Sequence, residues 1–331
     1  MQLPTTLQNA LERMIAAQPA AALERAALQL SARYRETGTD TPVIATALEA
    51  VAYAAWRMPA TYAALRAVFR RLAEVQPDFT PKRMLDIGAG SGAAIWAATE
   101  QWPSLQQVVA IERQPAMARI GKQLTANADL PTIVWQQQDV LTMDRLAESD
   151  LVVAGYVYGE IEPTARTLLL SRLWKASNGA LVLVEPGTPT GHTTILHARS
   201  ELIKRNAHLL APCPHTAACP LAEANDWCHF AQRIARPAFL RRLKAAEAPF
   251  EDEKFAYLIA SRYEGKPIDG RIVRHPIIHS GRIELQVCTE RGLQAMTITR
   301  SQKTLWRQAR DSGWGDPWTN NPPTGGGVSD D

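Results

Sequence analysis

Long apolar runs are absent from this sequence of 331 residues: nowhere do eighteen apolar residues follow one another. A helix that crosses a bilayer needs about 20 such residues, so we expect no transmembrane helix and no membrane partner. The chain begins MQLPTTLQNALERM, without the basic and then apolar layout of a secretory signal or the Arg- and Ser-rich composition of an import sequence. These absences predict a cytoplasmic protein.

Cysteine is scarce as well, with four residues in the whole chain. A small secreted scaffold stapled by disulfides would use a much larger share of cysteine. Hydrophobic residues make up 46% of the chain and charged residues 21%, as in globular proteins. The sequence is therefore that of a globular protein long enough for one large domain or two smaller ones.

The chain as a whole has almost no excess of either charge, with a net charge of only +3. The charge is nevertheless distributed unevenly along the sequence. Residues 199–310 contain 19 Lys and Arg against 11 Asp and Glu, a net charge of +8, which leaves −5 for the remainder. A basic half of this kind favours a polyanionic partner, nucleic acid above all. A solvated surface with an accidental asymmetry is the alternative.

The apolar spacing changes along the chain. Residues 1–78 place apolar positions three and four apart, which predicts a helical region. Five short apolar segments then alternate with helical ones, which predicts a parallel, doubly wound α/β sheet. These segments are KRMLDIGAG, QVVAIER, TIVWQQQDV, DLVVAGYVYGE and GALVLVEPG. We divide the rest into a helical region (1–78), an α/β domain (79–198), a basic cysteine-rich insertion (199–254), C-terminal antiparallel strands completing the sheet (255–318) and a disordered tail (319–331).

A glycine-rich loop follows the first predicted strand and opens a helix, at Asp86-Ile-Gly-Ala-Gly-Ser-Gly92. Glycines allow a ligand close to the backbone, and the helix N-terminus favours negative charge. This loop resembles the S-adenosylmethionine loop of class I methyltransferases more than the dinucleotide fingerprint. Glu112 ends the second strand, where a carboxylate can bind ribose hydroxyls, and Asp139 ends the third. The expected cofactor contacts are Asp86, Gly88, Ala89, Gly90, Gly92, Glu112, Asp139 and Val140.

Two familiar signatures of methyl acceptors are missing. After the fourth strand the chain reads AGYVYGE, without the proline pair of enzymes that methylate exocyclic amines. Neither the fourth nor the fifth strand contains the cysteine nucleophile of enzymes that methylate carbon 5 of pyrimidines. Tyr156, Tyr158 and Glu160 could line a pocket, although such residues at a strand end often pack or cap. No catalytic residue can be assigned from the sequence.

The four cysteines are Cys213, Cys219, Cys228 and Cys288, three of them in one window framed by prolines. Four thiols suit either two disulfides, which are disfavoured in a cytosolic protein, or a metal site. The metal could be zinc or an iron–sulfur cluster, and the spacing alone does not choose between them. His215 and His229 are rival ligands for a zinc site. A basic set surrounds the window, with Trp227 and Phe230 between its members: Arg199, Lys204, Arg205, Arg233, Arg236, Arg241, Arg242 and Lys244.

The chain resembles the Rsm22 family. The matching motifs occur in the same order and run from about residue 55 to Asp316. The most specific of them are APCPHTAACPL and DWCHFAQRIAR. The others are LDIGAGSGAAIWAA, GYVYGEI, LVEPGTPTG, EDEKFAYLIASR, QVCTERG and ARDSGWGD. It implies a class I methyltransferase fold, association with the small ribosomal subunit, S-adenosylmethionine as a cofactor, and a [4Fe–4S] cluster on the four cysteines.

Three functions remain open at this stage. The first is an S-adenosylmethionine-dependent methyltransferase acting on small-subunit rRNA. The second is a non-catalytic assembly factor that binds rRNA. The third is a small-molecule or protein methyltransferase with a structural zinc site. We expect no DNA partner.

Overall fold

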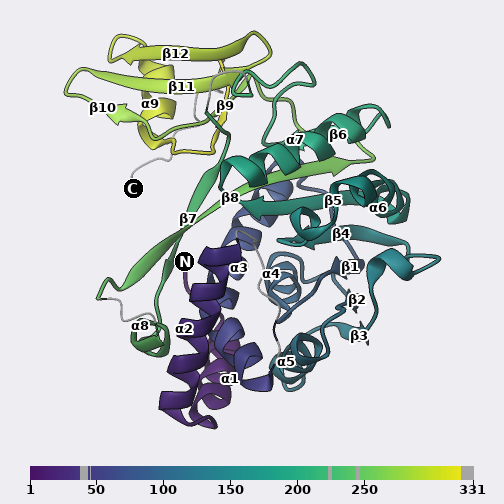
Figure 1. The fold of residues 1–331 in the computed structure, drawn as a ribbon. Coiled ribbons are helices and arrows are strands. Elements are labelled where there is room, and N and C mark those ends of the chain that lie inside the picture. The colour runs from purple at the N-terminus through teal and green to yellow at the C-terminus, as the bar shows by residue number, and fades with distance from the viewer. Residues whose placement is uncertain (38–43, 45, 223–225, 244–246, 322–331) are drawn as a thin grey trace.

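The computed structural model of the chain, drawn in Figure 1, describes residues 1–37, 44, 46–222, 226–243 and 247–321. Within these residues the chain forms an eight-stranded sheet and a five-stranded sheet. No helix of the described part is both long and apolar enough to cross a bilayer. Most of the predicted disordered tail, residues 322–331, lies outside the described residues.

The large sheet has the strand order β3-β2-β1-β4-β5-β8-β6, with β7 paired to β8. The first five strands run parallel and β8 runs antiparallel to β5, β6 and β7. Its strands are β1 (Arg83–Ile87), β2 (Gln107–Ile111), β3 (Thr132–Gln136), β4 (Ser149–Gly155), β5 (Ser177–Pro186), β6 (His208–Ala211), β7 (Phe230–Ala235) and β8 (Phe250–Ser261). The predicted class I methyltransferase-like α/β fold is confirmed.

Helices cover both faces of this sheet. Consecutive strand residues such as Met84 and Leu85 belong to two separate apolar cores, because successive side chains of a strand point to opposite faces of the sheet. One core includes α3, α4 and α5, and the other α6 and α7. The helices are α1 (Thr5–Ala16), α2 (Ala20–Thr37), α3 (Ala47–Val75), α4 (Ala93–Gln101), α5 (Pro115–Thr125), α6 (Pro163–Ala176) and α7 (Pro189–Ile203).

Helix α3 is the longest helix and positions one wall of the cavity described below. A capping box fixes its start: the Thr46 side chain accepts from the Glu49 N–H, and the Glu49 carboxylate accepts from the Thr46 N–H. This reciprocal pair satisfies two N–H groups that an unfinished helix end would leave unpaired. Pro59 lies inside the helix, which nevertheless continues to Val75.

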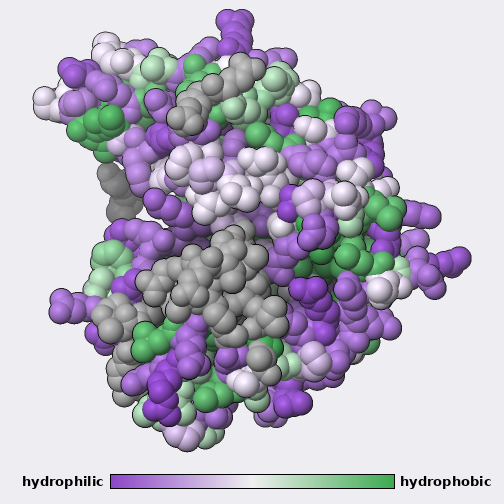
Figure 2. Space-filling view, in the orientation of Figure 1, coloured by the Kyte–Doolittle hydropathy of each residue, from purple (hydrophilic) through white to green (hydrophobic). Residues whose placement is uncertain are grey.

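The second sheet lies beyond α7 in Figure 1 and has its own core against α9. The order is β10-β11-β9-β13, with β12 paired to β11. Its elements are β9 (Gly270–Ile272), β10 (Ile277–Ile278), β11 (Arg282–Thr289), β12 (Gly292–Thr299), α9 (Lys303–Asp311) and β13 (Pro317–Trp318). Figure 2 shows a mostly hydrophilic face with an apolar patch at the edge where β10 lies, at Ile277 and Ile278, which are both exposed.

Two sequence-based boundaries differ from the structure. The apolar spacing of ILHARSELIKRNAHLL (195–210) predicts a helix over the whole stretch, but α7 ends at Ile203, because Asn206 adopts a left-handed φ of 55° and the chain then enters β6. Of the C-terminal strands expected to complete the large sheet, only β8 does so, and β9 to β13 form the second sheet. Strands β6 and β7, together with helix α8 (Ala238–Leu243), were not anticipated.

Candidate functional site

The glycine loop leaves β1 at Ile87 and turns into α4 through three left-handed residues, Gly88 at φ 64°, Gly90 at φ 53° and Gly92 at φ 85°. A Cβ atom on Gly88 would lie 2.6 Å from Cγ2 of Val157, a distance at which something must move. Glycine is therefore required at this position both for its backbone conformation and for its lack of a side chain. The loop borders a cavity at the carboxyl ends of β1, β2 and β4.

Glu112, directly after β2, holds the loop. Its carboxylate accepts from the Gly90 N–H at 2.9 Å and from the Gln114 N–H at 2.7 Å. Burial raises the pKa of Glu112, and the two N–H groups oppose that shift by stabilising the charged form. Since each carboxylate oxygen has a second lone pair, Glu112 can also accept from hydroxyl groups of a ligand in the cavity.

Asp86 and Asp139 border the same cavity in different ways. Asp86 is buried, and its Oδ2 has no hydrogen-bond partner among the described residues. Burial, followed by the nearby charge of Glu112, raises the pKa of Asp86 well above its usual value. Asp139 instead accepts from the Leu141 N–H at 2.9 Å and caps a short 3-10 turn, Val140–Thr142. An unpartnered buried oxygen beside a cavity marks a place for a donor from a ligand.

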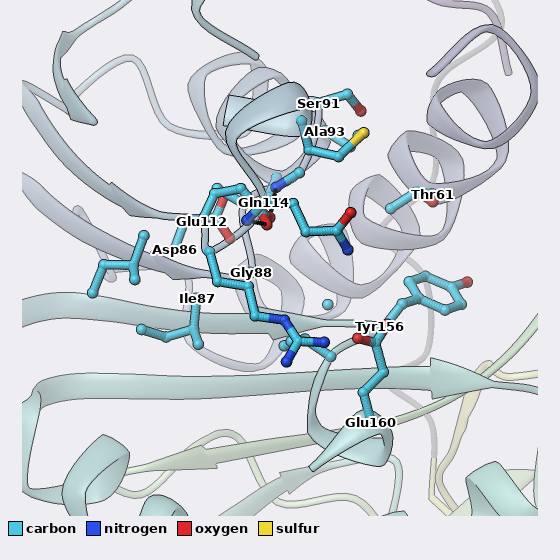
Figure 3. Close-up of a pocket in the computed structure, with 18 of the residues that line it drawn as sticks. Thr61, Asp86, Ile87, Gly88, Ser91, Ala93, Glu112, Gln114, Tyr156 and Glu160 are labelled. Atoms are coloured by element: carbon cyan, nitrogen blue, oxygen red, sulfur yellow. Dashed lines mark hydrogen bonds between the residues drawn. The ribbon is translucent and has the colours of Figure 1, made fainter. Parts of the chain in front are cut away.

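The opposite wall comes from α3 and from the end of β4. Figure 3 shows Thr61 and Tyr156 on this side, facing Asp86 and Glu112 across the cavity. Tyr156 has a left-handed φ of 59°, which is strained for a tyrosine, and its hydroxyl donates to Glu253 at 2.9 Å. Arg57, which also lines the cavity, donates to the same carboxylate at 2.8 Å. The sequence did not identify Arg57 or Thr61, because nothing local in α3 indicates a ligand site.

Seven of the eight predicted cofactor contacts line this one cavity. They are Asp86, Gly88, Ala89, Gly90, Glu112, Asp139 and Val140. Gly92 lies outside the lining, where it caps α4 at φ 85°. Tyr156 and Glu160, considered for the pocket from the sequence, also line it, whereas Tyr158 is buried and bonds to His197 at 3.0 Å.

The four cysteines, far apart in sequence, line a second cavity. Cys213, Cys219 and Cys228 come from the segment between β6 and β7, and Cys288 comes from β11 of the small sheet. All four are free thiols. Burial raises the pKa of Cys288 to about 12, and burial together with the other three thiols raises the pKa of Cys228 well above its usual value. Thiols of this kind become anionic when a metal binds them.

The spacing of the thiols bears on which group they suit. Among the described residues, no three Cys, His, Asp or Glu side chains come close enough to surround a single ion. A zinc ion at about 2.3 Å from each sulfur would need such close grouping. In this structure the four thiols line one cavity.

The two histidines take different places. His215 Nε2 lies 3.5 Å from the Cys288 sulfur. His229 lies away from the cavity lining, where its ring stacks on Trp227 and meets Trp314 edge-on, with centroids 4.9 Å apart. Phe230 is buried against Phe255 and Tyr257.

Several of the basic residues near the cysteines are not available to a partner. Arg199 is buried and donates to the carbonyl oxygens of His215 and Ala217. Others form ion pairs, Arg233 with Asp252 at 2.8 Å and Arg236 with Glu251 at 3.1 Å. Lys204 and Arg205 both pair with Glu201. Arg241 is exposed, while the side chain of Arg242 and the whole of Lys244 lie outside the described structure.

Comparison with known families decides the relationship. A family model described as "Mitochondrial small ribosomal subunit Rsm22" matches residues 47–319, which is most of the chain. The chain belongs to the Rsm22 family. The resemblance predicted from the cysteine window and the glycine loop is thus confirmed.

Two curated Rsm22-type relatives are similar over most of this chain. The human ribosome assembly protein METTL17, mitochondrial, is 29% identical over 288 residues, covering 80% of this chain and 61% of its own. The Rsm22-cox11 tandem protein 2, mitochondrial, of Schizosaccharomyces pombe is 27% identical, covering 87% of this chain and 45% of its own. The chain thus spans about half to three fifths of the length of these relatives.

The predicted cytoplasmic location is wrong on this comparison. The matched Rsm22 model and both relatives carry mitochondrial names. The prediction rested on the composition of the first residues, which do not determine where a protein of this family works.

Solved structures resemble this Rsm22-family chain only distantly. The magnesium protoporphyrin IX methyltransferase of Synechocystis PCC 6803 with bound SAH has a TM-score of 0.41 and 11% identity, covering 72% of this chain and all of its own. The N-methyltransferase NodS of Bradyrhizobium japonicum WM9 has a TM-score of 0.38 and 14% identity, covering 61% of this chain and 94% of its own.

Proposed function

We propose that this chain is an S-adenosylmethionine-binding, methyltransferase-like protein that takes part in assembling a small ribosomal subunit of the mitochondrial kind. The observation that carries the proposal is the cavity at the ends of β1 and β2, where the glycine loop and Glu112 meet, in a member of a family named for that subunit. The human relative is named as a ribosome assembly protein.

The residues present fit the cofactor. Glu112 would accept from ribose hydroxyls, Asp139 and Val140 would border the adenine, and the loop would approach the amino-acid portion. The unpartnered Oδ2 of Asp86 supports a donor at that end. When bound, S-adenosylmethionine supplies an electrophilic methyl group.

Glu112→Gln tests the cofactor site. The variant keeps the size of the side chain but removes the charge that holds the Gly90 and Gln114 N–H groups. We expect S-adenosylmethionine to bind about tenfold more weakly, which corresponds to about 1.4 kcal/mol, in isothermal titration calorimetry. Glu284→Gln in the small sheet is the matched control and should bind normally. Equal affinity of the two variants for S-adenosylmethionine would show that Glu112 does not contribute to cofactor binding.

We infer that Cys213, Cys219, Cys228 and Cys288 hold a metal centre, and that a [4Fe–4S] cluster suits it better than zinc. Support comes from four free thiols around one cavity and, for the cluster, from what the resemblance to the Rsm22 family implies. Such a centre would tie the segment between β6 and β7 to β11 of the small sheet. Its chemistry is therefore first that of a covalent staple.

We propose that helix α9 and the turn that precedes it contact rRNA. Lys303, Arg307 and Arg310 are exposed and spaced four and three residues apart in α9, which places them on one helical face, and exposed Arg300 lies in the turn before the helix. Only Arg310 of these four forms an ion pair among the described residues, with Asp311. Exposed cations without acidic partners are available to neutralise phosphates.

The double variant Lys303→Gln/Arg307→Gln tests this surface. We expect weaker binding to the small-subunit rRNA and a shallower dependence of log affinity on log salt, by about 0.7 for each single-strand phosphate that the variant no longer neutralises. The control is Arg233→Gln/Lys204→Gln, which removes the same charge from exposed residues that already pair with carboxylates. The measurement is filter binding or fluorescence anisotropy across a salt series. Equal slopes in the two double variants would rule out α9 as the rRNA-binding surface.

A non-catalytic role is favoured by one feature of the cavity. At the end of β4, where an acceptor would meet the cofactor, the Tyr156 hydroxyl and the Arg57 guanidinium are both bound to Glu253. Incubation with labelled cofactor and unmodified small-subunit rRNA separates the two roles. Label in the rRNA establishes an enzyme, and tight cofactor binding without transfer establishes an assembly factor.

A further inference from the structure

Two arginines are buried beside the four thiols. Arg199 on α7 is 4% exposed and Arg271 on β9 is 1% exposed, and both line the cysteine cavity. They reach it from different parts of the fold, Arg199 from a helix of the large sheet and Arg271 from the small sheet. Arginine is rarely buried to this degree unless it is paired.

The contacts of these arginines satisfy only part of each guanidinium. Arg199 donates through Nη2 to the His215 and Ala217 carbonyl oxygens, at 2.8 and 2.7 Å. Arg271 donates to the Pro212 oxygen at 2.9 Å and to the Gly315 oxygen at 3.1 Å. Among the described residues, Nε of Arg199 and Nη2 of Arg271 are buried without an acceptor.

Neither charge has a counter-ion within the described structure. No ion pair of Arg199 or Arg271 is formed there, and the lining of the cavity contains no carboxylate. A buried cation without an opposite charge is costly, because hydrogen bonds to carbonyl oxygens replace only part of the hydration that it has lost. The cavity therefore calls for an anionic group, and four thiolates around iron would provide one.

We propose that Arg199 and Arg271 are the positioning residues of this centre: they brace the backbone of the cysteine segment and direct their unpaired N–H groups at its sulfur atoms. This inference rests on the cluster proposed above. Positive charge beside a cluster stabilises its reduced form, which carries one more negative charge, so the two arginines raise its reduction potential. Hydrogen bonds to the sulfurs act in the same direction.

The test uses the full chain, purified anaerobically, with Arg199→Gln, Arg271→Gln and the corresponding lysine variants. We expect the glutamine variants to retain iron but to require a more strongly reducing poise in a dithionite titration followed by electron paramagnetic resonance. The lysine variants keep the charge and should recover part of the shift. Arg205→Gln, which removes an equal charge from a surface pair with Glu201, should leave the potential unchanged.

The outcomes separate the two proposals. Iron in the wild-type protein together with an unchanged potential in all four variants overturns the role of the arginines and leaves the cluster standing. Wild-type protein that takes up no iron overturns the cluster and, with it, this inference. If one glutamine variant does not fold, the other decides: a lower potential supports the proposal, and an unchanged potential counts against it.

Discussion

Replacing Gly88 with alanine is expected to abolish measurable binding of S-adenosylmethionine while the protein stays folded. At φ 64° an alanine is strained by about 1 to 2 kcal/mol, and its Cβ would lie 2.6 Å from Val157. The loop must then move at the point where the ligand approaches the backbone. Isothermal titration calorimetry with wild-type and variant protein measures the loss, and circular dichroism checks the fold.

The chain offers two controls that separate strain from crowding. Gly292 has a φ of 98° and nothing within 4 Å of an added Cβ, so Gly292→Ala introduces strain alone. Gly281 has open space and no left-handed φ, so Gly281→Ala introduces neither. Both should bind the cofactor like the wild type. Normal binding by Gly88→Ala would show that the loop does not contact the ligand.

Cys228→Ser is expected to remove nearly all iron and to loosen the small sheet from the large one. Cys228 lines the same cavity as the other three thiols, whose charges contribute to its raised pKa, so we expect its replacement to open the centre. We expect the iron content to fall from about four per chain to near zero, with loss of the visible absorption band. Iron analysis and a spectrum of the anaerobically purified protein measure this.

Histidine variants show which ligands complete the centre. His215 lies 3.5 Å from the Cys288 sulfur, so His215→Gln tests whether a histidine binds the metal. His229→Gln is the companion, because His229 packs on Trp227 and Trp314 outside the cavity. Both should retain iron if the four cysteines hold it. One zinc per chain, no colour, and loss of zinc from His215→Gln would instead establish a zinc site.

Local sequence accounts for the parts of the site that lie within one strand and its following loop. Asp86 lies near the end of β1, and Gly88 and Glu112 directly follow β1 and β2, so strand position and residue type were enough to predict where they lie. The wall made by Arg57, Thr61 and Tyr156 could not be predicted in this way. It depends on how α3 crosses the sheet, which local spacing does not encode.

The cysteine cavity likewise has one part that the local sequence predicts and another that it does not. The window at 213–228 was evident from composition, whereas the inclusion of Cys288 depends on the pairing of β9 with β11, which brings Arg271 opposite Cys288. The basic residues were misread for a related reason. Charge can be counted from sequence, but burial of Arg199 and the pairing of Arg233 follow from tertiary contacts.

Strand β8 lines the cysteine cavity and is bonded to two residues that line the cofactor cavity. Glu253 holds Arg57 and Tyr156 at the cofactor cavity, and Ala256 and Tyr257, about 10 to 13 Å further along, line the cysteine cavity. A shift of β8 caused by a ligand in one cavity is therefore passed on to the other cavity. If metal binding in the cysteine cavity strengthens cofactor binding by a given free energy, cofactor binding strengthens metal binding by the same free energy. With both proposed ligands bound, iron supply and methyl-donor supply would then act on this chain together.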